Sequence, residues 1–101
     1  MVRVEFGDKA FTSKKKTVLF LRHFLDTHDG NGARVDADVV RAWLGPLIRN
    51  HPEAARKTAQ WSGRVVVDLR DGWNCVFLVK HDGSREGISL SKSCVDGSVA
   101  V

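Results

Sequence analysis

The sequence is poor in the residues that usually cross-link a small protein or carry its chemistry. It contains two cysteines, two prolines and no tyrosine among 101 residues. Cys75 and Cys94 can form at most one disulfide, which excludes a disulfide-rich scaffold, and in a reducing compartment we expect two small buried thiols. Because there is no C-x-x-C pair and no histidine pair at finger spacing, the sequence predicts no metal site and no cofactor.

Long apolar runs are also missing. Charges occur within the first five residues, and no segment approaches the roughly 20 apolar residues of a membrane-spanning helix. We therefore expect a cytoplasmic protein with no membrane partner. The hydrophobic content of 43% and charged content of 28% are typical of a globular chain, and the length predicts a single domain over residues 1–101. A net charge of +4 permits a polyanionic partner.

Hydrophobic periodicity predicts a strand and two helices in the first half of the chain. Residues 2–6 alternate apolar and charged side chains, which is the pattern of a half-buried strand. Apolar residues recur at helical spacing over about 13–27 and again over about 37–50. The second helix should be kinked at Pro46 or consist of two short pieces, because proline lacks the amide that would bond back to Ala42.

The second half changes to the period of strands. We expect strands at about 64–70, 74–80 and 87–91, joined by tight turns into a small antiparallel sheet. Residues 2–6 are a candidate fourth strand of the same sheet. The predicted fold class is therefore α+β, with two main helices packed on one face of this sheet.

The sheet face away from the helices is a candidate binding surface. We expect Cys75, Phe77 and Val79 to face the core. Trp61 and Trp73, at strand beginnings, lie either at the edge of the opposite face or in the core. The opposite face would then carry Arg64, Val66, Arg70, Val76, Leu78 and Lys80. Cations among apolar side chains suit a single-stranded nucleic acid, whose bases stack while its phosphates meet the cations. Alternatively, the N-terminal strand or the C-terminal tail covers this face.

Two further stretches carry charge. Lys14, Lys15 and Lys16 open the first helix, where positive charge opposes the helix dipole, so they are either a phosphate-binding cluster or a solvated helix end. In the loop that follows, Asp29 and Asp38 fall at ligand positions of an EF-hand loop, but threonine stands where an aspartate should open it. An ordinary glycine-containing loop explains this segment, and we predict no calcium site.

The stretch H-P-E-A-A-R-K at residues 51–57 is a candidate site or a joint. Pro52 at a first helical position and two cations at the end are typical of a short helix. Most of the stretch is therefore predicted to connect two pieces of structure. His51 is then a capping residue rather than a general base. Lys57 is either functional or part of a structural ion pair.

Several short motifs occur in a defined order between residues 11 and 95. They are F-T-S-K-K-K at 11–16, H-P-x-x-x-x-K at 51–57, C-x-F at 75–77, D-G-S at 82–84 and S-L-S-K-S-C-V at 89–95. Together they resemble the DCL family, named after the plant "defective chloroplasts and leaves" protein, here as a short stand-alone bacterial or phage-type member. The matching motif residues are His51, Pro52, Lys57, Phe77, Asp82, Gly83 and Cys94.

The resemblance implies RNA, or a transcription or ribosome-linked protein complex, as the partner. Plant members are linked to ribosomal RNA processing, and the domain also occurs at the end of the largest subunits of RNA polymerases IV and V. This chain departs from the family in lacking the glycine-rich continuation after Lys57. It also has one extra residue before Cys94.

We therefore predict a non-catalytic RNA-binding or RNA-processing and transcription accessory domain. The expected nucleic-acid contacts are Lys14, Lys15, Lys16, Lys57, Arg64, Lys80, Arg85, Lys92 and Trp61. The alternative is a protein-interaction module that docks on an RNA polymerase or ribosome-linked complex through an apolar patch of Val66, Val76 and Leu78. An enzyme is the third choice, because no paired carboxylates, nucleophile motif or phosphate loop marks a catalytic residue.

Overall fold

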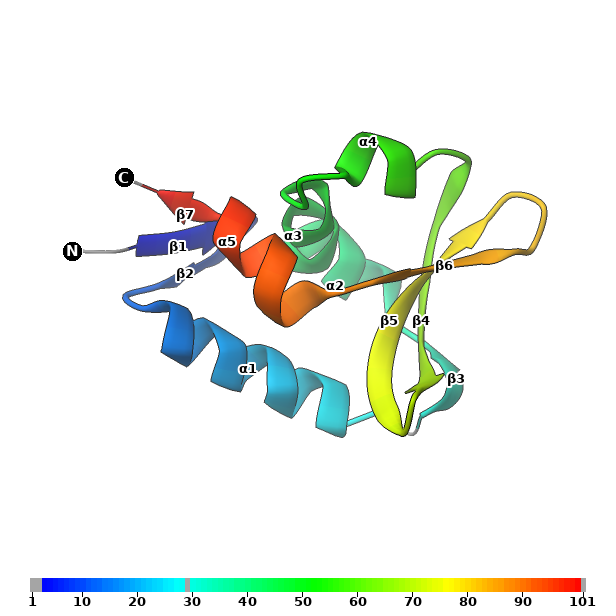
Figure 1. The fold of residues 1–101 in the computed structure, drawn as a ribbon, viewed down its shortest axis with the longest axis horizontal. Coiled ribbons are helices and arrows are strands. Elements are labelled where there is room, and N and C mark those ends of the chain that lie inside the picture. The colour runs from blue at the N-terminus through cyan, green and yellow to red at the C-terminus, as the bar shows by residue number, and fades with distance from the viewer. Residues whose placement is uncertain (1–2, 29, 101) are drawn as a thin grey trace.

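The computed structural model describes residues 3–28 and 30–100 and confirms the α+β class (Figure 1). One antiparallel sheet has the strand order β2-β1-β7, with β1 at Arg3–Phe6, β2 at Lys9–Phe11 and β7 at Val99–Ala100. The other has the order β3-β4-β5-β6, with β3 at Asn31–Arg34, β4 at Trp61–Arg70, β5 at Trp73–Lys80 and β6 at Arg85–Ile88.

Helical segments lie between the two sheets (Figure 1). They are α1 at Lys14–Asp26, α2 at Ala37–Val39, η1 at Val40–Leu44, α3 at Gly45–Arg49, α4 at Ala54–Lys57, η2 at Leu90–Cys94 and α5 at Val95–Gly97. The first helix agrees with the predicted range, and it begins where the Ser13 hydroxyl accepts a hydrogen bond from the Lys16 amide at 3.1 Å. No helix in the described ranges is long and apolar enough to cross a membrane.

The predicted second helix runs without a break through α2, η1 and α3, from Ala37 to Arg49. Its middle is a π-helical turn, in which the Gly45 amide bonds to the Val40 carbonyl five residues back. Pro46 follows directly. Since proline has no amide to offer the Ala42 carbonyl, the wider turn accommodates the ring within one continuous helical run.

The carbonyl left free by Pro46 has another partner. The amide of Asp8, in the turn between β1 and β2, donates to the Ala42 oxygen at 3.0 Å. The turn can approach this closely because Gly7 has a φ of +57°, and a Cβ there would lie 2.1 Å from the Ala42 oxygen. A proline in one element thus fixes the position of a glycine turn in another.

Two strand predictions are wrong. Residues 2–6 do not join the four-stranded sheet, because β1 pairs with β2 and β7 in the separate small sheet, and Val2 lies outside the described residues. The third strand of the hairpin region ends at Ile88 instead of residue 91. The chain turns helical at Leu90, because Leu90 and Cys94 are buried at helical spacing.

The predicted orientation of β5 is also wrong. Val76 and Leu78 are 1% and 0% exposed and belong to the core, whereas Cys75, Phe77 and Val79 lie on the opposite face. The cause is the two-residue turn at Asp71 and Gly72, which pairs Arg70 with Trp73 and so sets Val65 opposite Leu78. The expected apolar docking patch of Val66, Val76 and Leu78 is therefore not exposed.

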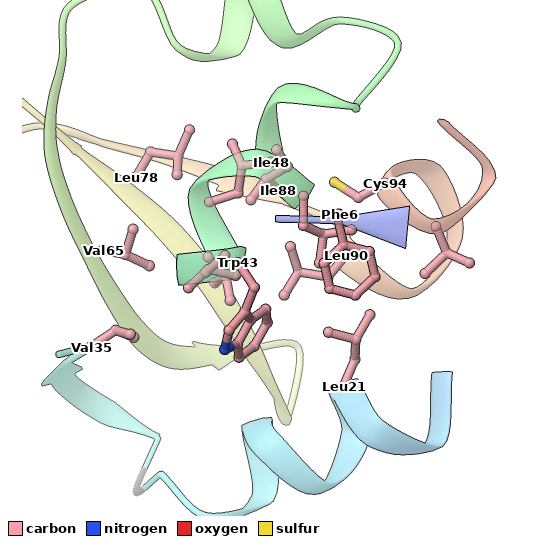
Figure 2. Packing of buried hydrophobic residues seen from close by; sticks show 14 of the residues in the cluster. Phe6, Leu21, Val35, Trp43, Ile48, Val65, Leu78, Ile88, Leu90 and Cys94 are labelled. Atoms are coloured by element: carbon pink, nitrogen blue, oxygen red, sulfur yellow. The ribbon is translucent and has the colours of Figure 1, made fainter. Parts of the chain in front are cut away.

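The core centres on Trp43, which comes from the π turn and reaches towards α1 (Figure 2). Its ring lies 5.1 Å from that of Phe20, 4.9 Å from that of Phe24 and 6.1 Å from that of Phe6. Around it are the inner residues of β4, β5 and β6 and the apolar side of η2. This one cluster joins both sheets to the helices, and among the described residues no helix covers the other face of the four-stranded sheet (Figure 1).

Candidate functional site

The outer face of the four-stranded sheet carries a short apolar strip surrounded by arginines. Val66 lies opposite Phe77, and Arg64 lies opposite Val79. Val66 is 8% exposed but is not part of the core cluster. Phe77 and Val79, on the same face, are half-buried. We call Val66, Phe77 and Val79 with the exposed side chains of Arg34, Arg64, Arg70 and Arg85 the outer face.

Most of the positive charge on the outer face is not neutralised. Arg85 bonds to the Asp68 carboxylate at 2.9 Å. Within the part of the chain that the structure describes, the other three arginines have no carboxylate within 4.0 Å. Arg70 extends across to β6, where a Cβ at Gly87 would lie 2.6 Å from its Nη1 and 3.3 Å from the Phe77 ring. The glycine therefore leaves room for a guanidinium beside an aromatic ring.

The lysine run lies at the other end of the molecule. The α1 helix begins beside α5 and the small sheet, away from the turn between β5 and β6 (Figure 1). Lys14 pairs with Asp96 at 2.9 Å, Lys16 donates to the Thr12 hydroxyl at 3.3 Å, and Lys15 is exposed. Lys92 is exposed on η2, which also packs on α1. The predicted nucleic-acid residues therefore fall into two separate groups.

Lys57 is held inside the structure. Its ammonium donates to the Gly87 carbonyl at 3.1 Å and to the Glu86 carboxylate at 3.3 Å, and its side chain is only 16% exposed. Arg56 also approaches Glu86, at 3.5 Å. These contacts join α4 to β6, so the structural ion pair is the role that the geometry gives to Lys57.

His51 and Cys94 lie near this lysine. The Nδ1 atom of His51 accepts the amide of Glu53, the N-cap residue of α4, at 2.9 Å, so His51 holds the turn that leads into α4. Burial, and then the charge of Lys57, lower the pKa of His51. Burial raises the pKa of Cys94 to about 12, so its thiol stays protonated and is a poor nucleophile. The surroundings of both residues suit a structural role.

The D-G-S motif at residues 82–84 forms a turn. The Asp82 carboxylate accepts the Ser84 hydroxyl and amide, and these bonds lower the pKa of Asp82. Gly83 has a φ of +87°, which favours glycine, so Asp82 and Gly83 close the turn between β5 and β6. Pro52 lies in the turn before α4. Of the motif residues, Phe77 is the one on the outer face.

The Trp61 ring, which the sequence predicts to stack on a base, has contacts within the protein. Its Nε1 donates to the Arg64 carbonyl at 2.9 Å, and the Arg49 guanidinium lies 5.4 Å from its ring centroid. Lys80, opposite Trp61 in the sheet, is half-buried. One face of the indole is thus occupied by a protein cation.

A groove lies between α1 and the turn of the β4–β5 hairpin. It has a volume of about 460 Å³ and is lined by Val18, Arg22, Leu25, Asp26, Trp73, Asn74 and Ser91. Trp73 is 79% exposed. The Asn74 amide donates to the carbonyls of Leu25 and His28, at 3.1 and 3.2 Å, and so fixes the hairpin to the end of α1.

The groove continues towards the outer face. Residues 73–75 of β5 pair with β4, but β6 pairs only with residues 76–79, so among the described residues no strand borders their other side. A second hollow of about 220 Å³ lies there; it shares Trp73 with the groove and also reaches Arg70 and Cys75. Sequence reasoning did not identify Arg22, Asp26 or Arg34, because only the tertiary fold brings α1 and β3 beside these strands.

No metal centre is built from the described part of the chain, which contains no group of three or more histidine, cysteine or acidic side chains that could hold an ion. In the loop that resembles part of an EF-hand, where no calcium site was predicted, Asn31 lies in β3 and Asp38 pairs with Arg41. Asp29, at another ligand position of that pattern, lies outside the described residues.

Comparison with known proteins identifies a fold and no function. No family model matches the chain, and no curated protein is significantly similar to it. The chain is similar to an uncharacterized protein from Rhodospirillum rubrum whose structure was determined in solution by NMR. The two have a TM-score of 0.72 and 26% sequence identity, over 91% of this chain and 86% of that one.

Proposed function

We propose that the protein is a non-catalytic accessory domain that binds single-stranded RNA on its outer face. The observation that carries this proposal is the half-exposed Phe77 ring among four arginines, three of which have no carboxylate partner among the described residues. An unstacked base can lie on an aromatic ring while guanidinium groups meet the adjoining phosphates.

The shape of the surface favours a single strand over a duplex. Four-stranded sheets with aromatic side chains on an open face bind splayed bases in other RNA-binding domains, whereas duplex RNA presents its bases stacked and is recognised across its minor groove. The resemblance to DCL proteins, whose plant members are linked to ribosomal RNA processing, supports RNA as the polymer. Lys57, bonded to Glu86 and Gly87, and Trp61, with Arg49 over its ring, are not among the proposed contacts.

A salt-dependent binding titration tests the proposal. Labelled single-stranded and duplex RNA are titrated with the protein at two salt concentrations, and binding is followed by fluorescence anisotropy. We expect saturable binding to the single strand that weakens with salt, because each neutralised phosphate releases counterions. The double variant Arg64→Ala/Arg70→Ala should weaken binding, and its log–log salt slope should be smaller in magnitude by about one to two.

The matched control is the double variant Lys15→Ala/Lys16→Ala, which removes the same charge at the other end of the molecule. We expect this control to bind nearly as well as the wild type. If the lysine variant loses more affinity than the arginine variant, RNA binds at the start of α1 and the outer face is the wrong surface. If no single strand binds at low salt, the proposed function is wrong.

A further inference from the structure

The groove beside Trp73 is a second surface that could hold part of the same ligand. Trp73 is 79% exposed, the largest exposed fraction among the exposed large apolar side chains of the described residues. A tryptophan held this openly at the mouth of a hollow offers a flat face to a planar partner. The volume of about 460 Å³ lies within the roughly 300–1,000 Å³ of small-molecule sites and is ample for one nucleobase.

The polar side chains of the groove differ from those of the outer face. Arg22 and Asp26 are one helical turn apart on α1, and both line the groove. Asp26 is exposed and forms no ion pair with any residue that the structure describes. A carboxylate repels a phosphate but accepts hydrogen bonds from neutral N–H donors. The groove therefore suits a base, with a phosphate near Arg22 at its rim.

The identity of the base follows from the acceptor. A carboxylate has two oxygens and can accept two parallel bonds. Guanine presents two adjacent donors on its Watson–Crick edge, the ring N1–H and the exocyclic amino group, whereas adenine, cytosine and uracil each present one donor position on that edge. The Asn74 amino group already donates to the Leu25 and His28 carbonyls and is not free to donate to a base.

The groove also connects with the outer face. The second hollow shares Trp73 with the groove and reaches Arg70 along the unpaired edge of β5. A strand whose phosphates pass Arg70 can therefore place a neighbouring base against Trp73. We propose that the groove is a guanine subsite of the RNA surface, with Trp73 as the stacking platform and Asp26 as the acceptor. This inference rests on the proposed function.

The test uses short labelled single-stranded RNAs of uridine that carry one central guanosine, adenosine or cytidine, with the all-uridine strand as reference. We expect wild-type protein to bind the guanosine strand about tenfold more tightly than the others, as a bidentate base contact allows. Asp26→Asn should abolish this preference and leave binding to the all-uridine strand equal or tighter, because a negative charge is removed. Asp38→Asn, an exposed position with the same charge change, should keep the preference.

A second pair of variants isolates the stacking platform. Trp73→Ala should weaken binding of the guanosine strand by about tenfold, since stacking on one aromatic side chain supplies that much. Leu19→Ala, which shortens an exposed apolar side chain on α1 outside the groove, should have no effect. All four substitutions are at exposed positions, and thermal unfolding of each variant checks that the fold is retained.

The outcomes separate the two proposals. Salt-dependent binding of every strand with equal affinity, or a guanosine preference that survives Asp26→Asn, overturns the subsite and leaves the RNA-binding function standing. Absence of binding to any strand at low salt overturns both. A guanosine preference lost in Asp26→Asn and kept in Asp38→Asn is the result that we expect.

Discussion

Replacing Lys57 with methionine should lower the free energy of unfolding and leave the affinity for RNA unchanged. Methionine keeps most of the aliphatic stem but removes the ammonium, and with it the bonds to the Gly87 carbonyl and the Glu86 carboxylate. Hydrogen bonds to charged groups contribute roughly 1.5–3 kcal/mol each. Because Arg56 remains near Glu86, most of the loss falls on the bond to the carbonyl. We expect the free energy of unfolding to fall by about 2 kcal/mol.

Urea unfolding followed by fluorescence measures this loss, and the melting temperature should fall by roughly 10 °C, at about 4–8 °C per kcal/mol for a domain of this size. Lys15→Met is the control, because Lys15 is exposed and should change stability by less than about 0.5 kcal/mol. RNA affinity of folded Lys57→Met protein should equal that of the wild type. If Lys57→Met is as stable as Lys15→Met but binds RNA more weakly, the structural role argued for Lys57 is wrong.

Three further predictions concern the core and its titrating groups. Trp43→Ala should lower the free energy of unfolding by about 3–5 kcal/mol, measured by denaturant titration, because the indole is 5% exposed and contacts three rings; a loss below 1 kcal/mol would contradict the core described. The pKa of His51 is lowered in the fold, so the unfolded chain binds more protons than the folded one at mildly acidic pH. The free energy of unfolding should therefore be highest above pH 6.5 and decrease as the pH falls below that value. His51→Gln should flatten that fall in thermal melts taken across this pH range, and an unchanged slope would refute the assignment. Cys94 should resist iodoacetamide in the native protein while the partly exposed Cys75 reacts, as mass spectrometry would show; equal labelling would mean that Cys94 is not buried.

Local signals in the sequence were enough for the elements whose contacts are local. The periodicity of residues 13–27 predicts α1 to within a residue at each end, and Asp71-Gly72 marks the hairpin turn correctly. The same turn could have corrected the orientation of β5. Two turn residues pair Arg70 with Trp73, so odd positions of β4 must share a face with even positions of β5.

Other features depend on contacts that no window of sequence contains. The partner of β1 is the strand at Val99–Ala100, and a pattern within residues 2–6 cannot distinguish that neighbour from the larger sheet. The candidate groove also depends on contacts between distant parts of the sequence. Asp26 ends one helix and Trp73 begins a strand, and only the packing of the hairpin against α1 places both on one groove. For Lys57 the sequence left a functional role and a structural ion pair open, because its partners Glu86 and Gly87 are distant in sequence.

The pairing of β1 with β7 also constrains how the chain reaches its native state. Arg3 lies opposite Ala100, so this pairing joins residues that are far apart along the chain. Contacts of such long sequence separation form slowly, because the chain loses the entropy of loop closure before the strand pairing contributes any stabilisation. On a ribosome the four-stranded sheet and α1 can assemble while synthesis continues, but the small sheet must wait for its last strand. A nascent chain therefore passes through a stage in which Val4, buried in the finished fold, lacks its neighbour Val99.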